Sequence, residues 1–123
     1  MSVTYDTGAL IAAERNERRA WARHRALLEA GAAITVPTGV VAQAWRGGAR
    51  QALLARLLDG CETESLVDVQ ARRIGLLAGR TGITDVVDLS VAEGALRRGD
   101  VVVTSHPDDL VAAGVPPTRV VRA

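Results

Sequence analysis

The stretch "DVVDLSVAEGALRRGDVVVTSHPDDL", residues 85–110, contains one full alternation of the expected secondary structure. Residues 85–99 predict a helix, residues 100–105 a strand, and residues 107–114 a short second helix. The strand is apolar without polar alternation, which is typical of a strand that is buried on both faces. This order favours a parallel sheet that is covered by helices.

The rest of the chain repeats this alternation, with no repeat, linker or low-complexity segment. Thr38 and Asp68 are candidate caps for two of the helices. Strands are expected at 3–5, 32–37, 63–68 and 118–122, and helices at 7–16, 17–31, 39–48, 49–60 and 69–82. We therefore predict one α/β domain over residues 1–123, with a central, mostly parallel sheet. In such sheets ligands bind at the carboxyl ends of the strands, near a topological switch point.

Composition narrows the class of protein. Hydrophobic residues make up 48% of the chain, enough for a core, and the single cysteine, Cys61, excludes an internal disulfide. Cys61 is expected to be a buried packing residue, and His24, between two arginines, to lie at the surface. No secretory signal precedes the fold and the apolar runs are too short to span a bilayer, so we expect a soluble cytoplasmic protein.

The net charge is only +1, but every basic residue is arginine. A GC-rich genome favours arginine codons and is one explanation. Arginine also makes planar, two-pronged contacts with phosphate that lysine does not make. The arginines of residues 15–25 form the largest group along the chain. Such groups are more typical of a solvated helix face than of a binding patch, and the sequence leaves both interpretations open.

Acidic residues follow or face the ends of several predicted strands. Asp6 comes directly after the first strand, Asp85 and Asp88 open the helix at 85–99, and Asp109 follows the strand at 100–105. Clustered carboxylates repel unless a cation neutralises them, and oxygen ligands suit Mg²⁺ or Mn²⁺. Alternatively, Asp6, Asp85 and Asp109 could be helix-start acids that cap or meet the helix dipole. Asp88 lies among apolar residues, where an unpaired acid is costly.

Three segments together resemble the PIN-domain family, in particular its VapC-like toxin ribonucleases. They are "YDTGALIAAE" at 5–14, "TDVVDLSVA" at 84–92 and "VVVTSHPDDL" at 101–110. The resemblance implies a three-layer α/β/α fold and a Mg²⁺- or Mn²⁺-dependent endoribonuclease. It also implies that Asp6 and Asp88, with Asp85 as a near neighbour and Asp109, are catalytic or metal-binding acids. Thr104 would support the site by hydrogen bonding.

Two positions depart from the family pattern. Gln43 stands where a glutamate is usual, and His106 stands where an aspartate or asparagine is usual. Gln43 can offer a carbonyl oxygen but no charge, and an imidazole is a poorer Mg²⁺ ligand than a carboxylate. His106 could instead contact phosphate when protonated, or be a solvent-facing residue at a helix entry. These departures predict a weakened metal site.

The resemblance implies several partners: RNA, a cognate antitoxin protein, and a second copy of the chain in a homodimer. Arg46 and Arg15 are candidates for contacts with the RNA backbone. The apolar side of "ARQALLARLL", residues 49–58, is a candidate dimer interface. A second hypothesis is a degenerate PIN domain that binds RNA or a protein without cleavage. A receiver-like signalling domain would need a lysine near its C-terminal end, and this chain has no lysine.

Overall fold

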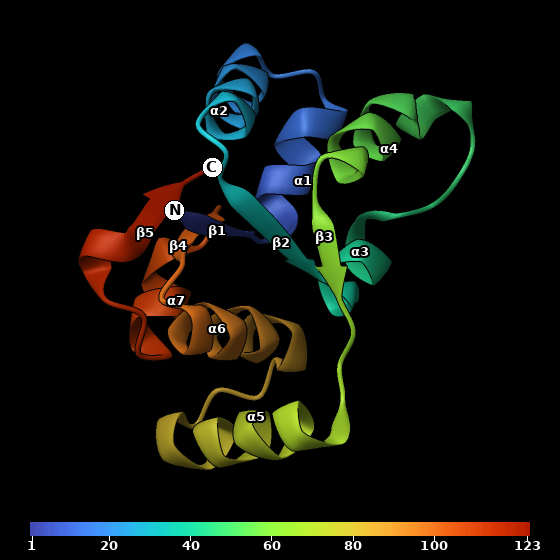
Figure 1. Cartoon of the computed structure of the whole chain (residues 1–123). Coiled ribbons are helices and arrows are strands. Elements are labelled where there is room, and N and C mark those ends of the chain that lie inside the picture. The colour runs from blue at the N-terminus through green and yellow to red at the C-terminus, as the bar shows by residue number, and fades with distance from the viewer.

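The computed structural model describes residues 1–123, and its centre is a five-stranded, all-parallel sheet (Figure 1). The order of the strands is β3-β2-β1-β4-β5. The strands are β1 (Ser2–Tyr5), β2 (Ala33–Pro37), β3 (Glu62–Glu64), β4 (Val101–Thr104) and β5 (Val120–Arg122). Register pairs Thr4 with Thr35 of β2 on one side and with Val102 of β4 on the other. The α/β class and the parallel sheet predicted from the sequence are confirmed.

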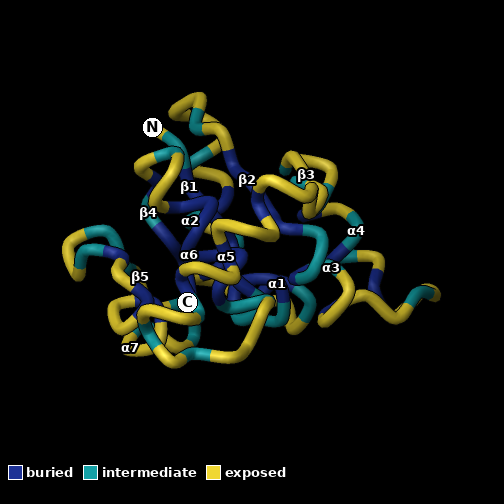
Figure 2. The backbone as a smooth tube through the Cα atoms, turned by 90° about the horizontal axis from the view of Figure 1, so that it is seen from below, coloured by how far each residue is buried: buried dark blue, intermediate teal, exposed yellow.

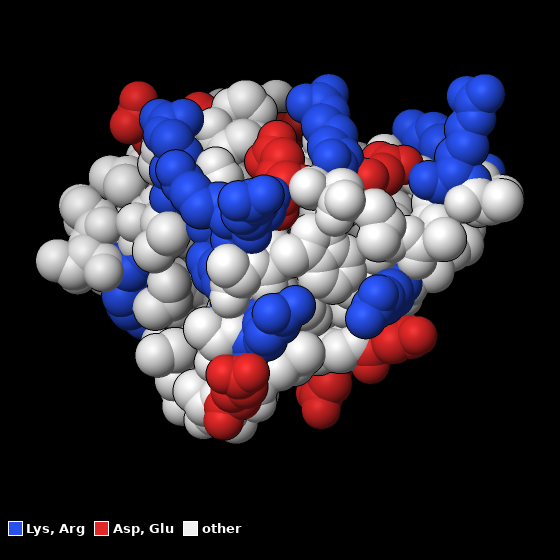
Figure 3. Space-filling view, turned by 90° about the horizontal axis from the view of Figure 1, so that it is seen from above, with Lys and Arg blue, Asp and Glu red and all other residues white.

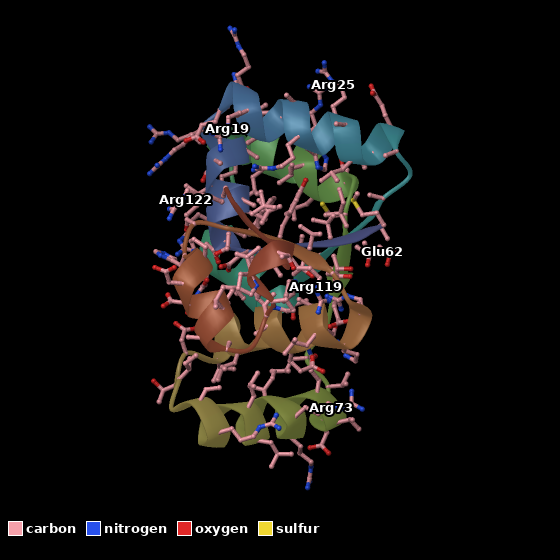
Figure 4. All side chains as sticks on the ribbon, turned by 90° about the vertical axis from the view of Figure 1, so that its left-hand side faces the viewer. Arg19, Arg25, Glu62, Arg73, Arg119 and Arg122 are labelled. Atoms are coloured by element: carbon pink, nitrogen blue, oxygen red, sulfur yellow. The ribbon has the colours of Figure 1, made fainter.

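Helices cover both faces of this sheet and make the fold three-layered, as Figures 1 and 4 show. The helices are α1 (Thr7–Glu14), α2 (Arg18–Glu29), α3 (Thr38–Ala44), α4 (Ala52–Asp59), α5 (Asp68–Thr81), α6 (Val86–Arg98) and α7 (Pro107–Ala112). Short 3-10 helices occupy Ala49–Gln51 and Pro117–Arg119. Helices α1, α2 and α4 lie over one face of the sheet. Helix α6 lies under the other face, and α5 packs outside α6. No helix of the structure has both the length and the apolar character that crossing a membrane requires.

Burial is concentrated in the central strands and the helices that touch them (Figure 2). Val3, Val36 and Val102 are at most 1% exposed, which explains why these strands show no polar alternation. The core packs aliphatic side chains, since the chain contains no phenylalanine. Helix α5 is mostly exposed because it packs mainly on α6.

The strand order creates a switch point beside β1. The chain runs from β1 outward to β2 and β3, then returns through α5 and α6 to the other side of β1, where it forms β4 and β5. The connections therefore leave the carboxyl ends of β1 and β4 in opposite directions. A crevice is expected there, because no connection covers that point.

Several local predictions were wrong by a few residues. The third strand covers Glu62–Glu64 instead of 63–68, and the helix predicted over 39–48 ends at Ala44. Trp45 adopts an extended backbone, with φ −76° and ψ 129°, and the chain then passes through two glycines with positive φ. The expected caps Thr38 and Asp68 are each the first residue of their helix, and neither helix has a side-chain cap at its start.

Two predictions about which side chains face outward also need correction. His24 is buried, at 4% exposed, and its Nδ1 lies 2.9 Å from the Tyr5 hydroxyl oxygen. Its neighbours at helical spacing, Trp21 and Leu27, turn the same side of α2 to the core. The candidate interface helix became α4, and its Leu54 and Leu57 are buried against the protein's own core. Its apolar side is therefore used within the fold.

Candidate active site

The four candidate aspartates line one pocket at the switch point. Asp6 follows β1, Asp85 and Asp88 begin α6, and Asp109 lies in the first turn of α7. The pocket has a volume of about 280 Å³. We call it the acidic pocket; its lining residues are Asp6, Thr7, Gly8, Ile11, Gln43, Asp85, Asp88, Ser105, His106 and Asp109. The carboxyl-end rule for parallel sheets thus gathers residues that are up to 103 positions apart.

Asp6 is fixed by hydrogen bonds from both sides of the switch point. Its Oδ1 accepts from the Thr7 backbone N–H at 2.7 Å, and its Oδ2 accepts from the Thr104 hydroxyl at 2.8 Å. Thr104 is fully buried, and its hydroxyl oxygen also accepts from the His106 backbone N–H at 3.0 Å. Asp6 is therefore the cap of α1 and, at the same time, a rigidly held wall of the acidic pocket.

Asp85 and Asp88 form a local pair at the start of α6. Asp85 is the N-cap, and its Oδ1 accepts from the Asp88 backbone N–H at 3.0 Å. Burial, followed by the charges of Asp85, Asp6 and Asp109, raises the pKa of the Asp88 carboxyl to about 6. His106 acts in the opposite direction, since a positive imidazole favours the ionised acid. Asp88 is thus the acid of this group whose pKa is raised by its neighbours' negative charges in addition to its burial.

No arginine neutralises this group of acids. The six ion pairs of the protein all involve Arg72, Arg73, Arg97 or Arg98, and none includes an aspartate of the acidic pocket. The N-terminal ends of α1 and α6 supply backbone N–H groups, whose partial positive charge offsets part of the repulsion. The alternative that these acids are helix-start residues is therefore met in part. Asp6 and Asp85 cap helices, and Asp88 and Asp109 lie in the first turns of α6 and α7, where the helix dipole favours an acid. Neither role explains why all four acids line one pocket.

The two positions that depart from the family pattern also line the pocket. Gln43, on α3, accepts a hydrogen bond through Oε1 from the Thr7 hydroxyl. His106 is the residue before α7, and its imidazole carries the only ionisable group of the pocket that can be positive. An amide and an imidazole therefore occupy places where carboxylates would add further negative charge.

Gly8 allows two segments of the pocket to approach each other closely. A Cβ atom at this position would lie 2.4 Å from the Ser105 Oγ and 2.8 Å from the Ser105 backbone nitrogen, closer than atoms can pack. The first turn of α1 therefore rests directly on the chain that leaves β4. Glycine is required here by contact, because only its missing side chain leaves room.

The donor set suits a hard divalent cation. Four carboxylates and one amide carbonyl offer oxygen ligands, which Mg²⁺ and Mn²⁺ prefer, and no protein cation competes for them. As the side chains stand, however, no three histidine, cysteine, aspartate or glutamate residues are grouped so that they could hold one ion. A cation would have to draw the carboxylates inward, against the repulsion that raises the pKa of Asp88.

The two arginines proposed for RNA contact lie in different settings. Arg15 lines a second pocket of about 280 Å³, which shares Gly8, Ile11 and Ser105 with the acidic pocket. The Arg46 guanidinium is turned back on its own segment, where Nη1 donates to the carbonyls of Ala42 and Trp45. Arg46 is not among the lining residues of the acidic pocket.

Sequence reasoning missed four residues that line the acidic pocket: Thr7, Gly8, Ile11 and Ser105. Ser105 directly follows β4, so the same carboxyl-end rule that selected Asp6 would have selected it. Thr7 and Gly8 follow Asp6, but their part in the site depends on contacts with Gln43 and Ser105 that no local pattern encodes.

Comparison with known proteins adds evidence on the fold. No protein-family model matches this chain, and no curated protein matches it. Among solved structures, the chain is similar to one in the crystal structure of VapBC2 from Rickettsia felis bound to a DNA fragment from their promoter. The TM-score is 0.77 at 16% sequence identity, and the match covers 100% of this chain and 99% of that chain. The three-layer PIN-like fold predicted from the sequence is therefore confirmed at the level of architecture.

Proposed function

We propose that this chain is a metal-dependent endoribonuclease of the kind found in toxin–antitoxin pairs, and that the acidic pocket is its active site. The observation that carries the proposal is the gathering of Asp6, Asp85, Asp88 and Asp109 in one pocket without a neutralising arginine. Asp6 is buried and Asp88 is half-buried, and a purely structural role would favour pairing these two acids with the abundant arginines, because unpaired buried charge is costly.

In this proposal Asp6 and Asp88 hold Mg²⁺ or Mn²⁺, with Asp85 and Asp109 completing the acidic wall. A bound cation of this type polarises a phosphoryl oxygen and lowers the pKa of water for in-line attack. Thr104 keeps the Asp6 carboxylate oriented through its 2.8 Å hydrogen bond. His106, when protonated, is placed to contact a phosphate oxygen at the rim of the pocket.

The similarity to a chain of a VapBC complex supports one further part of the proposal, the antitoxin partner. The physiological state would be a complex with an antitoxin protein, whose cationic side chain could neutralise the acidic pocket. A homodimer is part of the same proposal, although α4 does not offer the apolar face once expected for it. The substrate is RNA, whose phosphates reach the acids through the bound cation.

A second candidate function is binding of RNA or a protein partner without cleavage. The specific observations that favour it are Gln43 and His106, which leave the pocket with fewer carboxylates than the family pattern, and the lack of a ready three-residue metal group. Both candidates predict occupancy of the same face, and only the first predicts hydrolysis that depends on a cation.

The test is cleavage of a structured RNA by the purified protein with Mg²⁺, with Mn²⁺ and with EDTA. Asp6→Ala and Asp88→Ala should each lower the cleavage rate by at least about a hundredfold, the scale of losing a principal charge-stabilising group. Asp108→Ala is the matched control. Asp108 is an exposed acid in the same turn as Asp109, but it does not line the acidic pocket.

The same variants are examined by thermal melting with added Mn²⁺. A cation that binds only the folded state raises the melting temperature, and this rise should vanish in Asp6→Ala and Asp88→Ala but persist in Asp108→Ala. Well-folded wild-type protein that shows a cation-dependent rise without cleavage would support the binding function. If the wild-type protein shows neither the rise in melting temperature nor cleavage, a metal site at these acids is refuted.

A further inference from the structure

A cluster of like charges lies directly beside the acidic pocket. Arg15 lines the adjoining pocket, Arg19 and Arg23 belong to α2, and Arg122 belongs to β5. We call these four arginines the basic track. Figure 3 shows arginine side chains gathered in a contiguous group over α2, and Figure 4 places Arg19 and Arg122 on the same side of the molecule.

Hydrogen bonds connect the track to the acidic pocket in steps. Arg122 Nη1 donates to the backbone carbonyl of Ser105 at 3.5 Å, and Ser105 lines both pockets. Arg23 Nη1 donates to the backbone carbonyl of Arg122 at 3.3 Å. The charge of Arg19 is close enough to contribute, after burial, to the lowered pKa of Arg23. The track is therefore one continuous surface that begins at the rim of the acidic pocket.

None of these four arginines forms an ion pair. Glu17 lines the pocket beside Arg15, and its charge offsets part of the effect of Arg19 on the pKa of Arg23, but it makes no ion pair with any arginine. Neighbouring positive charges that lack acidic partners repel one another, and an anion that lies across them removes this cost. The adjoining pocket also contains the side chain of Ile11, which gives an apolar surface between the acids and the arginines.

We propose that the basic track binds the backbone of a single-stranded RNA, with one phosphate in the acidic pocket and the strand leaving over Ile11 toward Arg15, Arg19 and Arg122. This inference rests on the proposed function, since it assumes that the acidic pocket receives RNA. A single strand fits because each pocket, at about 280 Å³, is small, and a splayed strand can enter where a duplex cannot.

The track leads the RNA strand away from the acidic pocket along one path on the protein surface. Phosphates bind the arginines as two-pronged contacts, and a base packs against Ile11 without the need for a particular sequence. The acids and the arginines thus have separate tasks. The acids act on one phosphate through a cation, and the arginines hold the phosphates that follow it.

The test is binding of a fluorescein-labelled, mixed-sequence, single-stranded RNA of 12 nucleotides, measured by anisotropy in EDTA. The track variant is Arg15→Gln/Arg19→Gln/Arg122→Gln, and the control is Arg50→Gln/Arg56→Gln/Arg80→Gln. The control removes the same charge from unpaired arginines elsewhere on the surface. All six arginines are exposed, and melting temperatures are compared for both variants to show that each is folded.

We expect the track variant to bind at least about tenfold more weakly, and the control to change affinity by less than about threefold. The slope of log K against log salt concentration should fall by about 2 in the track variant, since each lost phosphate contact on a single strand removes about 0.7. Equal losses in the two variants, or no binding by the wild type, would overturn the track. Tighter binding of a matched DNA duplex than of the RNA would also overturn it.

The outcome is separable from that of the proposed function. Binding that depends on the track without cleavage under any cation leaves the track intact and refutes the nuclease. Cleavage of the 12-nucleotide RNA by the track variant with an unchanged KM leaves the nuclease intact and refutes the track.

Discussion

Two regions of this protein treat charge in opposite ways. Beneath the sheet, acids and arginines are paired in an ion-pair network formed by Glu64, Arg73, Glu93, Arg97, Arg98 and Asp100. At the carboxyl ends of β1 and β4, the acidic pocket and the basic track lie side by side, and neither contains an ion pair. The same fold therefore contains neutralised charge in one place and separated charge in another.

The ion-pair network has the character of a structural element. Asp100 is fully buried and accepts hydrogen bonds from Ser2, from Thr4 at 2.6 Å and from Arg98 at 2.8 Å. Burial alone would raise the pKa of Asp100, but these donors outweigh it and hold the pKa below its usual value. No buried polar side-chain atom of the protein is left without a partner. The contrast separates charges that are paired within the fold from charges of the acidic pocket and the basic track, which we propose to be used for a ligand.

The largest effect is expected from breaking the network at Asp100. Asp100→Ala leaves the half-buried Arg98 without this partner, and the free energy of unfolding should fall by about 3–5 kcal/mol. Urea unfolding at pH 7 measures the change. Asp100→Asn keeps an acceptor oxygen and should cost less, about 1–3 kcal/mol. A loss below 1 kcal/mol in both variants would show that the network does not stabilise the fold.

Removing a charge from the acidic pocket should stabilise the protein, the opposite of the effect at Asp100. The pKa of Asp88 in the folded state, about 6, lies above the value of about 3.9 expected for an unfolded aspartate. The folded protein therefore binds more protons between these values, and stability falls as the pH rises from 4 to 6. In EDTA at pH 7, Asp88→Asn should stabilise the protein by about 1–2 kcal/mol, after allowance for solvent screening.

Urea unfolding of the wild type and Asp88→Asn at pH 5 and pH 7 measures this effect. The wild type should gain stability at the lower pH relative to the variant, because only it carries the Asp88 carboxyl. A variant that is less stable than the wild type at pH 7 in EDTA would contradict the idea that Asp88 is an uncompensated acid.

Adding a charge to the pocket sharpens the comparison. Gln43→Glu places a further carboxylate among the acids, so the metal-free protein should lose about 0.5 kcal/mol, a magnitude typical of exposed charge interactions. The rise in melting temperature with Mn²⁺ should be larger than in the wild type, because a fifth carboxylate strengthens cation binding. Ala42→Glu, on the same helix but outside the pocket, is the control. Equal responses of the two variants would contradict the pocket's role.

The smallest effect is expected at the most exposed pair of the paired region. Arg72 and Asp68 lie 3.0 Å apart on α5, with side chains 79% and 77% exposed. Arg72→Ala should reduce the free energy of unfolding by about 0.3–0.5 kcal/mol, as for other exposed pairs one helical turn apart. Thermal melting at low and high salt measures it. A loss above 1 kcal/mol would show that this exposed ion pair contributes as much to the free energy of unfolding as a buried one does.

Much of the fold was predictable because its signals are local. Apolar strands such as 100–105 and the alternation with helices indicate a parallel sheet, and the carboxyl-end rule then brings Asp6, Asp85, Asp88 and Asp109 to one place. The flanking arginines favour a surface position for His24, whereas its helical spacing to Trp21 favours the core, and the structure agrees with the spacing.

The ion-pair network was not predictable in this way. Thr4 and Asp100 are 96 residues apart, and the partner of each charge in the network depends on side-chain packing between α5, α6 and the sheet. The same holds for the contact between Gly8 and Ser105. Sequence patterns fix which elements form and which ends meet, whereas contacts between distant side chains follow from the final packing.

The bond between Thr104 and Asp6 has a consequence for the protein during its synthesis. Asp6 is made about a hundred residues before Thr104, Ser105 and Asp109, and β1 cannot acquire its β4 neighbour until those residues follow. A nascent chain on the ribosome therefore carries only part of the acidic pocket until β4 is made. Whatever chemistry the pocket performs begins only when β4 has emerged and paired with β1.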